Sequence, residues 1–140
     1  MNLNINDKTA LVTGASTGIG RATAKALAAE GVRVAVSARR LNLLESLSAE
    51  IVAAGGKQPV IIESDLYAED AAKKLTDAAI TGLGHVDILV NNAGGSRSFK
   101  ELHVSEAAWQ EAITLNFHRP RQVADALHLR AADAGHDRGG

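Results

Sequence analysis

The sequence predicts an α/β fold built on a parallel sheet of about four strands. Short apolar runs alternate with longer amphipathic runs, which is the pattern of repeated strand–helix units. Glycines follow the amphipathic runs at positions where a left-handed residue commonly ends a helix, namely Gly31, Gly55 with Gly56, and Gly82 with Gly84. A denser glycine cluster joins the first apolar run to the first amphipathic run and marks the first strand-to-helix turn.

The apolar runs predict strands, in chain order, at Thr9 to Thr13, Val32 to Ser37, Val60 to Glu63 and Val86 to Asn91. The amphipathic runs between them predict helices at Ile19 to Ala29, Leu41 to Ala54 and Ala68 to Leu83. Because right-handed crossovers connect parallel strands, we expect the strand order 3-2-1-4.

A longer run after the fourth strand predicts one helix from Ser105 to about Leu127, continuing past Pro120. Its apolar positions are Ala108, Trp109, Ala112, Ile113, Leu115 and Phe117. We expect one folded domain over residues 1–127 and a polar, disordered tail over residues 128–140. Two interpretations of this tail stay open: a frayed polar terminus, or out-of-frame sequence after a frameshift.

Composition excludes several classes of function. The formal net charge is −1 and the basic residues are scattered, which argues against a nucleic-acid partner. With no cysteine there is no disulfide framework and no thiolate chemistry, and no apolar stretch reaches the roughly 18 residues that span a bilayer, so we expect a cytoplasmic protein without a membrane partner. No metal site is expected, because metal-ligand spacing is missing among His85, His103, His118, His128 and His136.

The first glycine cluster has the spacing G-x-x-x-G-x-G and is interpreted as a dinucleotide-binding turn. Gly14 lets the chain reverse, Gly18 lets the backbone approach a pyrophosphate, and Gly20 lets the helix pack closely. The phosphates would meet free N–H groups at the helix N-terminus. The turn also contributes Ser16, Thr17 and Ile19 to the expected site. Two alternatives are an ordinary strand-to-helix turn and a hydrolase elbow with Ser16 as nucleophile, which needs a downstream acid and histidine.

A second motif, Asn91-Asn92-Ala93-Gly94, ends the fourth expected strand. With Thr13-Gly14 and the glycines that follow, it resembles the short-chain dehydrogenase/reductase family from about Asp7 to about Ala126. The resemblance implies a Rossmann-like, doubly wound parallel sheet that is incomplete. Members of the family are longer, so residues 1–127 are expected to form a truncated dinucleotide-binding domain, the N-terminal half of an oxidoreductase that transfers hydride at a carbonyl or hydroxyl group.

The end of the second strand indicates the cofactor. No acid stands there to bind the ribose 2′-hydroxyl of NAD, whereas Arg39 offers a fork of donors to a 2′-phosphate, so NADP(H) is favoured over NAD(H). Ser37 and Arg40 would assist, although both arginines could also be solvated charges. The resemblance implies that Asp65 and Leu66 bind adenine, with a helix cap as the alternative for Asp65. It also places the nicotinamide ribose beside Asn92, Ala93 and Gly94.

Only one member of the family's catalytic group is present. The resemblance implies that Asn116 is the catalytic asparagine, which kinks a helix and holds a water through its carbonyl group. The family also needs a serine and a Tyr-x-x-x-Lys pair, but the sole tyrosine is Tyr67, and Ala71 stands four residues on. We therefore expect no activity from the chain alone. A non-catalytic nucleotide-binding module, and a partner that joins a second copy or a full-length relative through the Ser105 to Leu127 helix, stay open.

Overall fold

The computed structural model describes residues 3–94 and 104–137. Its strands are β1 (Thr9–Thr13), β2 (Arg33–Ala38), β3 (Val60–Glu63) and β4 (Ile88–Val90). Its helices are α1 (Gly18–Ala29), α2 (Leu41–Ala53), α3 (Ala71–Leu83), α4 (Glu106–Ile113) and α5 (Arg119–Asp137), with a π-helical segment η1 (Thr114–His118) between the last two. His103 and residues 138–140 lie outside the described residues.

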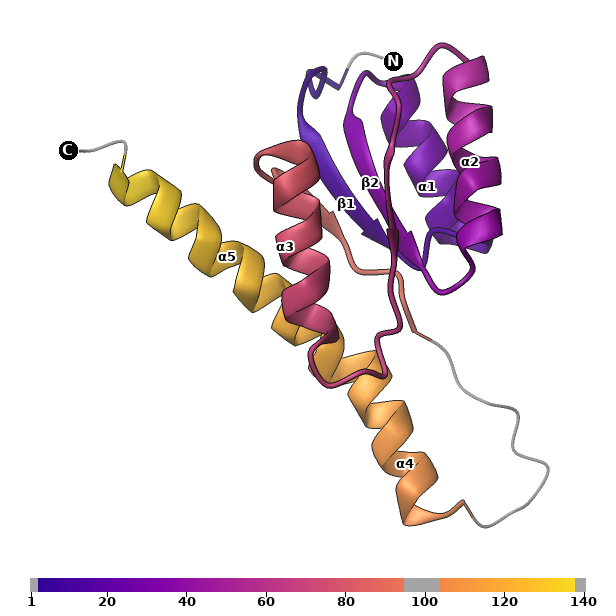
Figure 1. Ribbon diagram of the computed structural model, residues 1–140, viewed down its shortest axis with the longest axis vertical. Coiled ribbons are helices and arrows are strands. Elements are labelled where there is room, and N and C mark those ends of the chain that lie inside the picture. Colours follow the sequence, from indigo (N-terminus) through magenta and orange to yellow (C-terminus); the bar gives the residue numbers. More distant parts are fainter. Residues whose placement is uncertain (1–2, 95–103, 138–140) are drawn as a thin grey trace.

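The strands form one parallel sheet in the order β3-β2-β1-β4, which confirms the predicted order. In the register of the sheet, Val12 pairs with Val36 on one side and with Val90 on the other. Helices α1 and α2 cover one face, and α3 with the first part of α5 covers the other (Figure 1). This placement brings the carboxyl ends of all four strands to one edge of the sheet.

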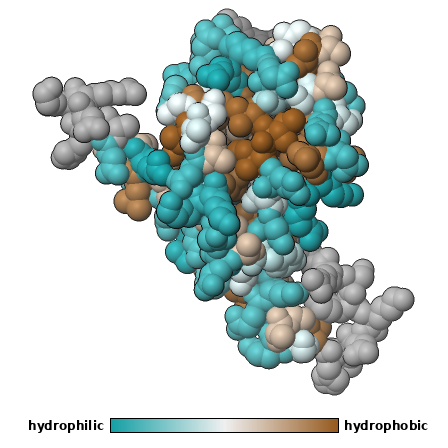
Figure 2. Space-filling view, in the orientation of Figure 1, coloured by the Kyte–Doolittle hydropathy of each residue, from teal (hydrophilic) through white to brown (hydrophobic). Residues whose placement is uncertain are grey.

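The core has two halves, one on each face of the sheet. Ala10 and Val12 of β1 pack with the inner residues of α1 and α2, whereas Leu11 points to the opposite face and packs against α3 and Val123 of α5. All five residues of β1 are buried, as expected for a central parallel strand covered on both faces. Hydrophobic side chains also gather at the surface over the sheet between α2 and α3 (Figure 2).

Most of the expected helix-ending glycines have a positive φ, at Gly31, Gly55 and Gly84. Gly82 differs from the expectation, because it lies inside α3. A Cβ there would come within 2.7 Å of the Val60 side chain, so this glycine allows α3 to lie close to β3.

The long C-terminal helix extends further than expected. The π-helical segment interrupts it at Thr114–His118, around Asn116, where the resemblance implied a kink, but α5 continues to Asp137 instead of ending near Leu127. Residues 128–137, which we expected to be disordered, are therefore helical. Arg130 pairs with Asp77 of α3, and the alanine-rich sequence after it favours a helix. The domain boundary at residue 127 stays a prediction.

None of the helices in the described residues combines the length and the apolar character needed to cross a membrane.

Candidate functional site

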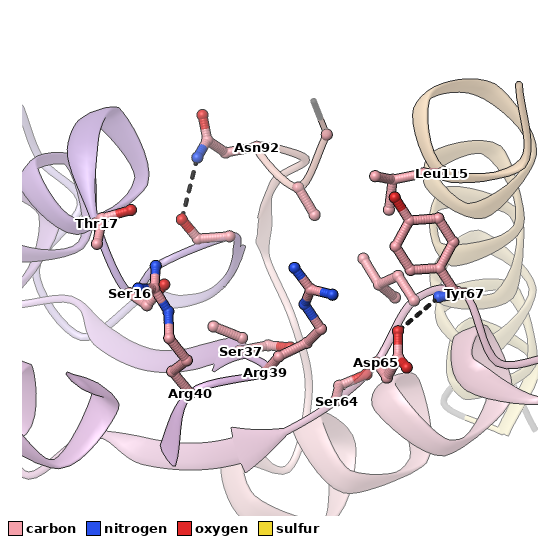
Figure 3. A pocket seen from close by; sticks show the side chains of 15 residues that line it. Ser16, Thr17, Ser37, Arg39, Arg40, Ser64, Asp65, Tyr67, Asn92 and Leu115 are labelled. Carbon is pink, nitrogen blue, oxygen red and sulfur yellow. Dashed lines mark hydrogen bonds between the residues drawn. The ribbon is translucent and has the colours of Figure 1, made fainter. Parts of the chain in front are cut away.

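A cavity of about 250 Å³ opens at the carboxyl edge of the sheet, where the four strands end (Figure 3). The residues predicted from the sequence that line it are Gly14, Ser16, Thr17, Ser37, Arg39, Arg40, Asp65, Leu66, Asn92, Ala93 and Gly94. Three predicted residues of the glycine turn, Gly18, Ile19 and Gly20, lie outside this lining, as does Asn116. Sequence reasoning missed Ala38, Ser64, Tyr67 and Leu115, which also line the cavity.

Each glycine of the turn has its own geometry. Gly14 has a φ of +61°, and a Cβ on it would lie 2.9 Å from the backbone N of Ala93. A Cβ on Gly20 would lie 2.2 Å from the carbonyl oxygen of Gly14, so both glycines permit close backbone packing. Gly18 has a φ of +60° but nothing within 4 Å of its Cβ position. Gly18 therefore leaves open space beside the turn.

The N-terminus of α1 is available to an anion. Thr17, the N-cap residue, makes no side-chain hydrogen bond to the helix, and the first turn contains no acidic residue. Ile19 is 77% exposed, although it is a large apolar side chain. Uncapped N–H groups at the positive end of a helix attract phosphate, and the space beside Gly18 admits one. This donor set and this space fit the pyrophosphate of a dinucleotide.

Hydrogen bonds lock the end of β4 to the glycine turn. The hydroxyl oxygen of Thr13 accepts from the backbone N–H groups of Asn92 (3.1 Å) and Ala93 (3.0 Å). In return, the side-chain amide of Asn92 donates to the carbonyl oxygen of Gly14 at 3.2 Å (Figure 3). The two sequence motifs are thus parts of one hydrogen-bonded unit.

Two arginines supply the positive charge of the cavity. Arg39 and Arg40 follow β2 and are exposed, and their side chains rise into the cavity in Figure 3. Within residues 3–94 and 104–137, neither guanidinium makes a hydrogen bond or an ion pair; Arg39 instead lies over the ring of Tyr67, 5.9 Å from its centroid. Ser37 is almost fully buried at the base of the cavity. Two cations without acidic partners are suited to bind an anion.

The opposite wall follows β3. The carboxylate of Asp65 accepts a hydrogen bond from the backbone N–H of Tyr67 at 3.0 Å, which closes a short turn before α3. Asp65 does not cap α3, whose N-cap residue is Asp70. The carbonyl oxygen of Leu66 accepts from Nε of Arg119 at 2.9 Å. Arg119 is only 8% exposed, so α5 holds this wall from behind with a buried guanidinium.

Asn116 lies in η1, where a π-helical turn interrupts the helix. Its side-chain amide donates to the carbonyl oxygen of Ala112 at 2.9 Å. A Cβ on Gly94 would lie 2.7 Å from its Oδ1, so Asn116 closely approaches the end of the Asn-Asn-Ala-Gly motif. The π-helical turn agrees with the expected kink, and such turns often occur at functional sites.

Asp87 stabilises the far end of β4, away from the cavity. Its carboxylate accepts from the backbone N–H of Thr9 at 2.9 Å and lies 3.1 Å from Nε2 of His85. Burial of this carboxyl opposes its ionisation, but the hydrogen bonds from Thr9 and the charges of His85 and Lys8 lower the pKa of Asp87 below its ordinary value. Asp87 therefore has a structural role at this end of the strand.

No cluster of three or more metal-ligating side chains occurs within the described parts of the chain.

Comparisons with known proteins agree with this geometry. The family model for short chain dehydrogenase matches residues 8–133. The chain belongs to the short-chain dehydrogenase family. A short chain dehydrogenase of Pseudocercospora fijiensis is 50% identical over 93 residues, which are 66% of this chain and 30% of that protein. The resemblance inferred from the two motifs is thus confirmed.

Solved structures of the family share the fold. A metagenomic short-chain oxidoreductase in complex with NADP is 35% identical, with a TM-score of 0.84, over 92% of this chain and 58% of that one. L-sorbose reductase of Gluconobacter frateurii, in complex with NADPH and L-sorbose, is 27% identical, with a TM-score of 0.84, over 91% of this chain and 48% of that one. The chain spans about half the length of these structures, and its Rossmann-like sheet is confirmed.

Proposed function

We propose that the chain is the NADP(H)-binding half of a short-chain oxidoreductase that transfers hydride at a carbonyl or hydroxyl group, and that it has no activity alone. The observation that carries the proposal is the pair of guanidinium groups, Arg39 and Arg40, which enter the cavity without acidic partners. The NADP and NADPH complexes of the two similar structures support the same cofactor.

Each part of the cavity suits one part of NADP(H). The uncapped N-terminus of α1 would receive the pyrophosphate beside Gly18. Arg39 would bind the 2′-phosphate, since a guanidinium presents several N–H donors to phosphate oxygens. Asp65 and Leu66 would bind the adenine on the opposite wall. The nicotinamide ribose would then lie near Asn92 and Gly94, and Gly94 is close to Asn116.

The cofactor, when bound, would supply the hydride. The chain itself would supply the asparagine of the family's proton relay, Asn116, but not its acid. Tyr67 contacts Arg39 at the end of the cavity proposed for the 2′-phosphate, and the residue four positions after it is Ala71, not a lysine. Without a proton donor, a bound NADPH would not reduce a carbonyl group at a useful rate.

Calorimetry with NADPH and NADH tests the cofactor. We expect NADPH to bind more tightly by about 1.5 to 3 kcal/mol, the usual contribution of a charged hydrogen bond, which is about 10-fold to 150-fold in Kd. Arg39→Ala should remove most of this preference. Arg33→Ala is the matched control, because Arg33 is an exposed arginine at the opposite end of β2. An Arg39→Ala variant with unchanged preference would contradict the proposal.

The same samples test catalysis. NADPH oxidation in the presence of a panel of ketones and aldehydes should not exceed the rate without protein. Sustained turnover that falls in the Asn116→Ala variant would show that the chain is active without the family's tyrosine and lysine.

A second candidate function is association with another copy of the chain or with a full-length relative. The observation that supports this second candidate is that one face of α4 and η1 exposes large apolar side chains on successive turns. Trp109 is 55% exposed, Ile113 is 40% exposed and Phe117 is 59% exposed. Exposed apolar patches of this kind mark interaction surfaces.

A further inference from the structure

Among the described residues that line the cavity, Tyr67 is the one with an aromatic side chain. Its backbone N–H donates to the carboxylate of Asp65 at 3.0 Å, which fixes the turn that carries it. From this turn the ring extends into the cavity, where the guanidinium of Arg39 lies 5.9 Å from the ring centroid (Figure 3). The contact joins the end of β2 to the wall that follows β3.

The contact matters because, among the described residues, the Arg39 side chain makes no hydrogen bond or ion pair and contacts this ring. An exposed arginine loses rotamer freedom when it binds a ligand, and this loss weakens the binding. A ring that restricts the guanidinium before the ligand binds reduces this loss of rotamer freedom. The guanidinium lies over the face of the ring and makes no hydrogen bond within the described residues, so its N–H groups remain available to a ligand.

We propose that Tyr67 is a positioning residue for the 2′-phosphate of NADP(H): its ring holds the Arg39 guanidinium at the cavity so that it binds the phosphate. The inference rests on the proposed function, which assigns the 2′-phosphate to Arg39, and it adds a residue that selects between the two cofactors. The hydroxyl group of Tyr67 has no part in this role, because the cation is attracted to the face of the ring.

Two fragments of the cofactor isolate the effect. Adenosine 2′,5′-bisphosphate and 5′-AMP differ only in the 2′-phosphate, so the ratio of their Kd values measures recognition of that phosphate. A general disturbance of the fold weakens both fragments and leaves the ratio unchanged. The variants are Tyr67→Leu, which removes the ring, and the matched control Tyr67→Phe, which keeps it. Both keep the backbone N–H that bonds to Asp65.

We expect Tyr67→Leu to lower the preference for adenosine 2′,5′-bisphosphate by about 3-fold to 10-fold, with 5′-AMP affinity changed by less than about twofold, as a partly exposed cation–π contact implies. Tyr67→Phe should retain the wild-type ratio. In the double variant Tyr67→Leu with Arg39→Ala, the loss should not exceed that of Arg39→Ala alone, because both changes remove one interaction.

The outcomes separate the two proposals. If Arg39→Ala abolishes the preference but Tyr67→Leu leaves it unchanged, the role of Tyr67 is overturned and the proposed function stands. An equal effect of Tyr67→Phe and Tyr67→Leu would also overturn it, since the hydroxyl group would then be responsible. If the wild-type chain shows no preference for the 2′-phosphate, or binds neither fragment, the proposed cofactor is wrong and the inference fails with it.

Discussion

Strands β1 and β4 have similar sequences but different surroundings. Both are apolar runs, yet every residue of β1 is buried whereas all three residues of β4 are only half-buried. β1 pairs with a strand on each side, and β4 pairs with β1 alone among the described strands. An apolar pattern therefore indicates that a strand is suited to burial. How far the strand is buried depends on the strands and helices that pack beside it.

The helices repeat this contrast. α1, α2 and α3 each bury one face against the sheet. α4 buries none of its residues, and the buried residues identified in α5 are Arg119 and Val123. The part of the molecule that carries the glycine turn and the two arginines is thus well packed, whereas the part that carries Asn116 exposes apolar side chains. Stability and cofactor binding should depend on the first part more than on the second.

The largest expected effect comes from comparing equivalent leucines in the two strands. Leu11 and Leu89 pair across β1 and β4, but Leu11 is fully buried and Leu89 is not. Leu11→Ala should lower the free energy of unfolding by about 3 kcal/mol, and Leu89→Ala by about 1 kcal/mol. Urea denaturation of both variants measures the difference. Equal losses would mean that β4 is as well covered in solution as β1.

A smaller effect is expected where the two strands begin. The carboxylate of Asp87 accepts from Thr9 and joins β4 to β1, so Asp87→Asn should lower the free energy of unfolding by about 1 kcal/mol at neutral pH. Because the folded-state pKa of Asp87 is lowered, its ionised form stabilises the fold above the unfolded-state pKa of about 3.9. That contribution is lost as the pH falls through the lower folded-state pKa.

Urea denaturation of the wild type and of Asp87→Asn at several pH values tests whether the stabilisation by Asp87 is lost on acidification. The difference between them should be constant near neutral pH and should shrink once the pH is below about 4. His85→Gln is the control, because it removes the imidazole that contacts Asp87 but leaves the hydrogen bonds from Thr9. A difference that grows on acidification would contradict the assignment.

The same contrast explains how much the sequence predicted. Thr9–Thr13, the glycine turn and the strand order follow from local patterns and from a general rule of handedness, so they were predicted correctly. The contact between Thr13 and Asn92 joins residues far apart in the chain, and no local pattern records it. The contact between Arg39 and Tyr67 is hidden for the same reason.

The C-terminal helix was predicted less well, for a physical reason. Helix periodicity shows that a segment is amphipathic, but one five-residue π-helical segment is too short to show a period of its own, so only the resemblance at Asn116 indicated a kink here. Near its end, α5 pairs Arg130 with Asp77 of α3, a contact between residues far apart in the chain that no local pattern records. The buried position of Arg119 was not predicted either. The only signal in the sequence is a basic residue that follows Asn116 by about one helical turn.

The smallest expected effect on stability concerns the exposed face of α4 and η1. Phe117→Ser should change the free energy of unfolding by less than about 0.5 kcal/mol, because the side chain is 59% exposed and contributes little to the core.

The same change should weaken self-association, measured by sedimentation velocity over a range of concentrations. The matched control is Leu129→Ser, which replaces a side chain of similar exposure on α5. Association that persists in Phe117→Ser would point to the edge of β4 that pairs with no other described strand, because backbone groups along such an edge can also join chains. Amide exchange distinguishes these routes, since pairing along β4 would slow exchange at Ile88–Val90 as the concentration rises, whereas contact through α4 and η1 would leave those amides unchanged.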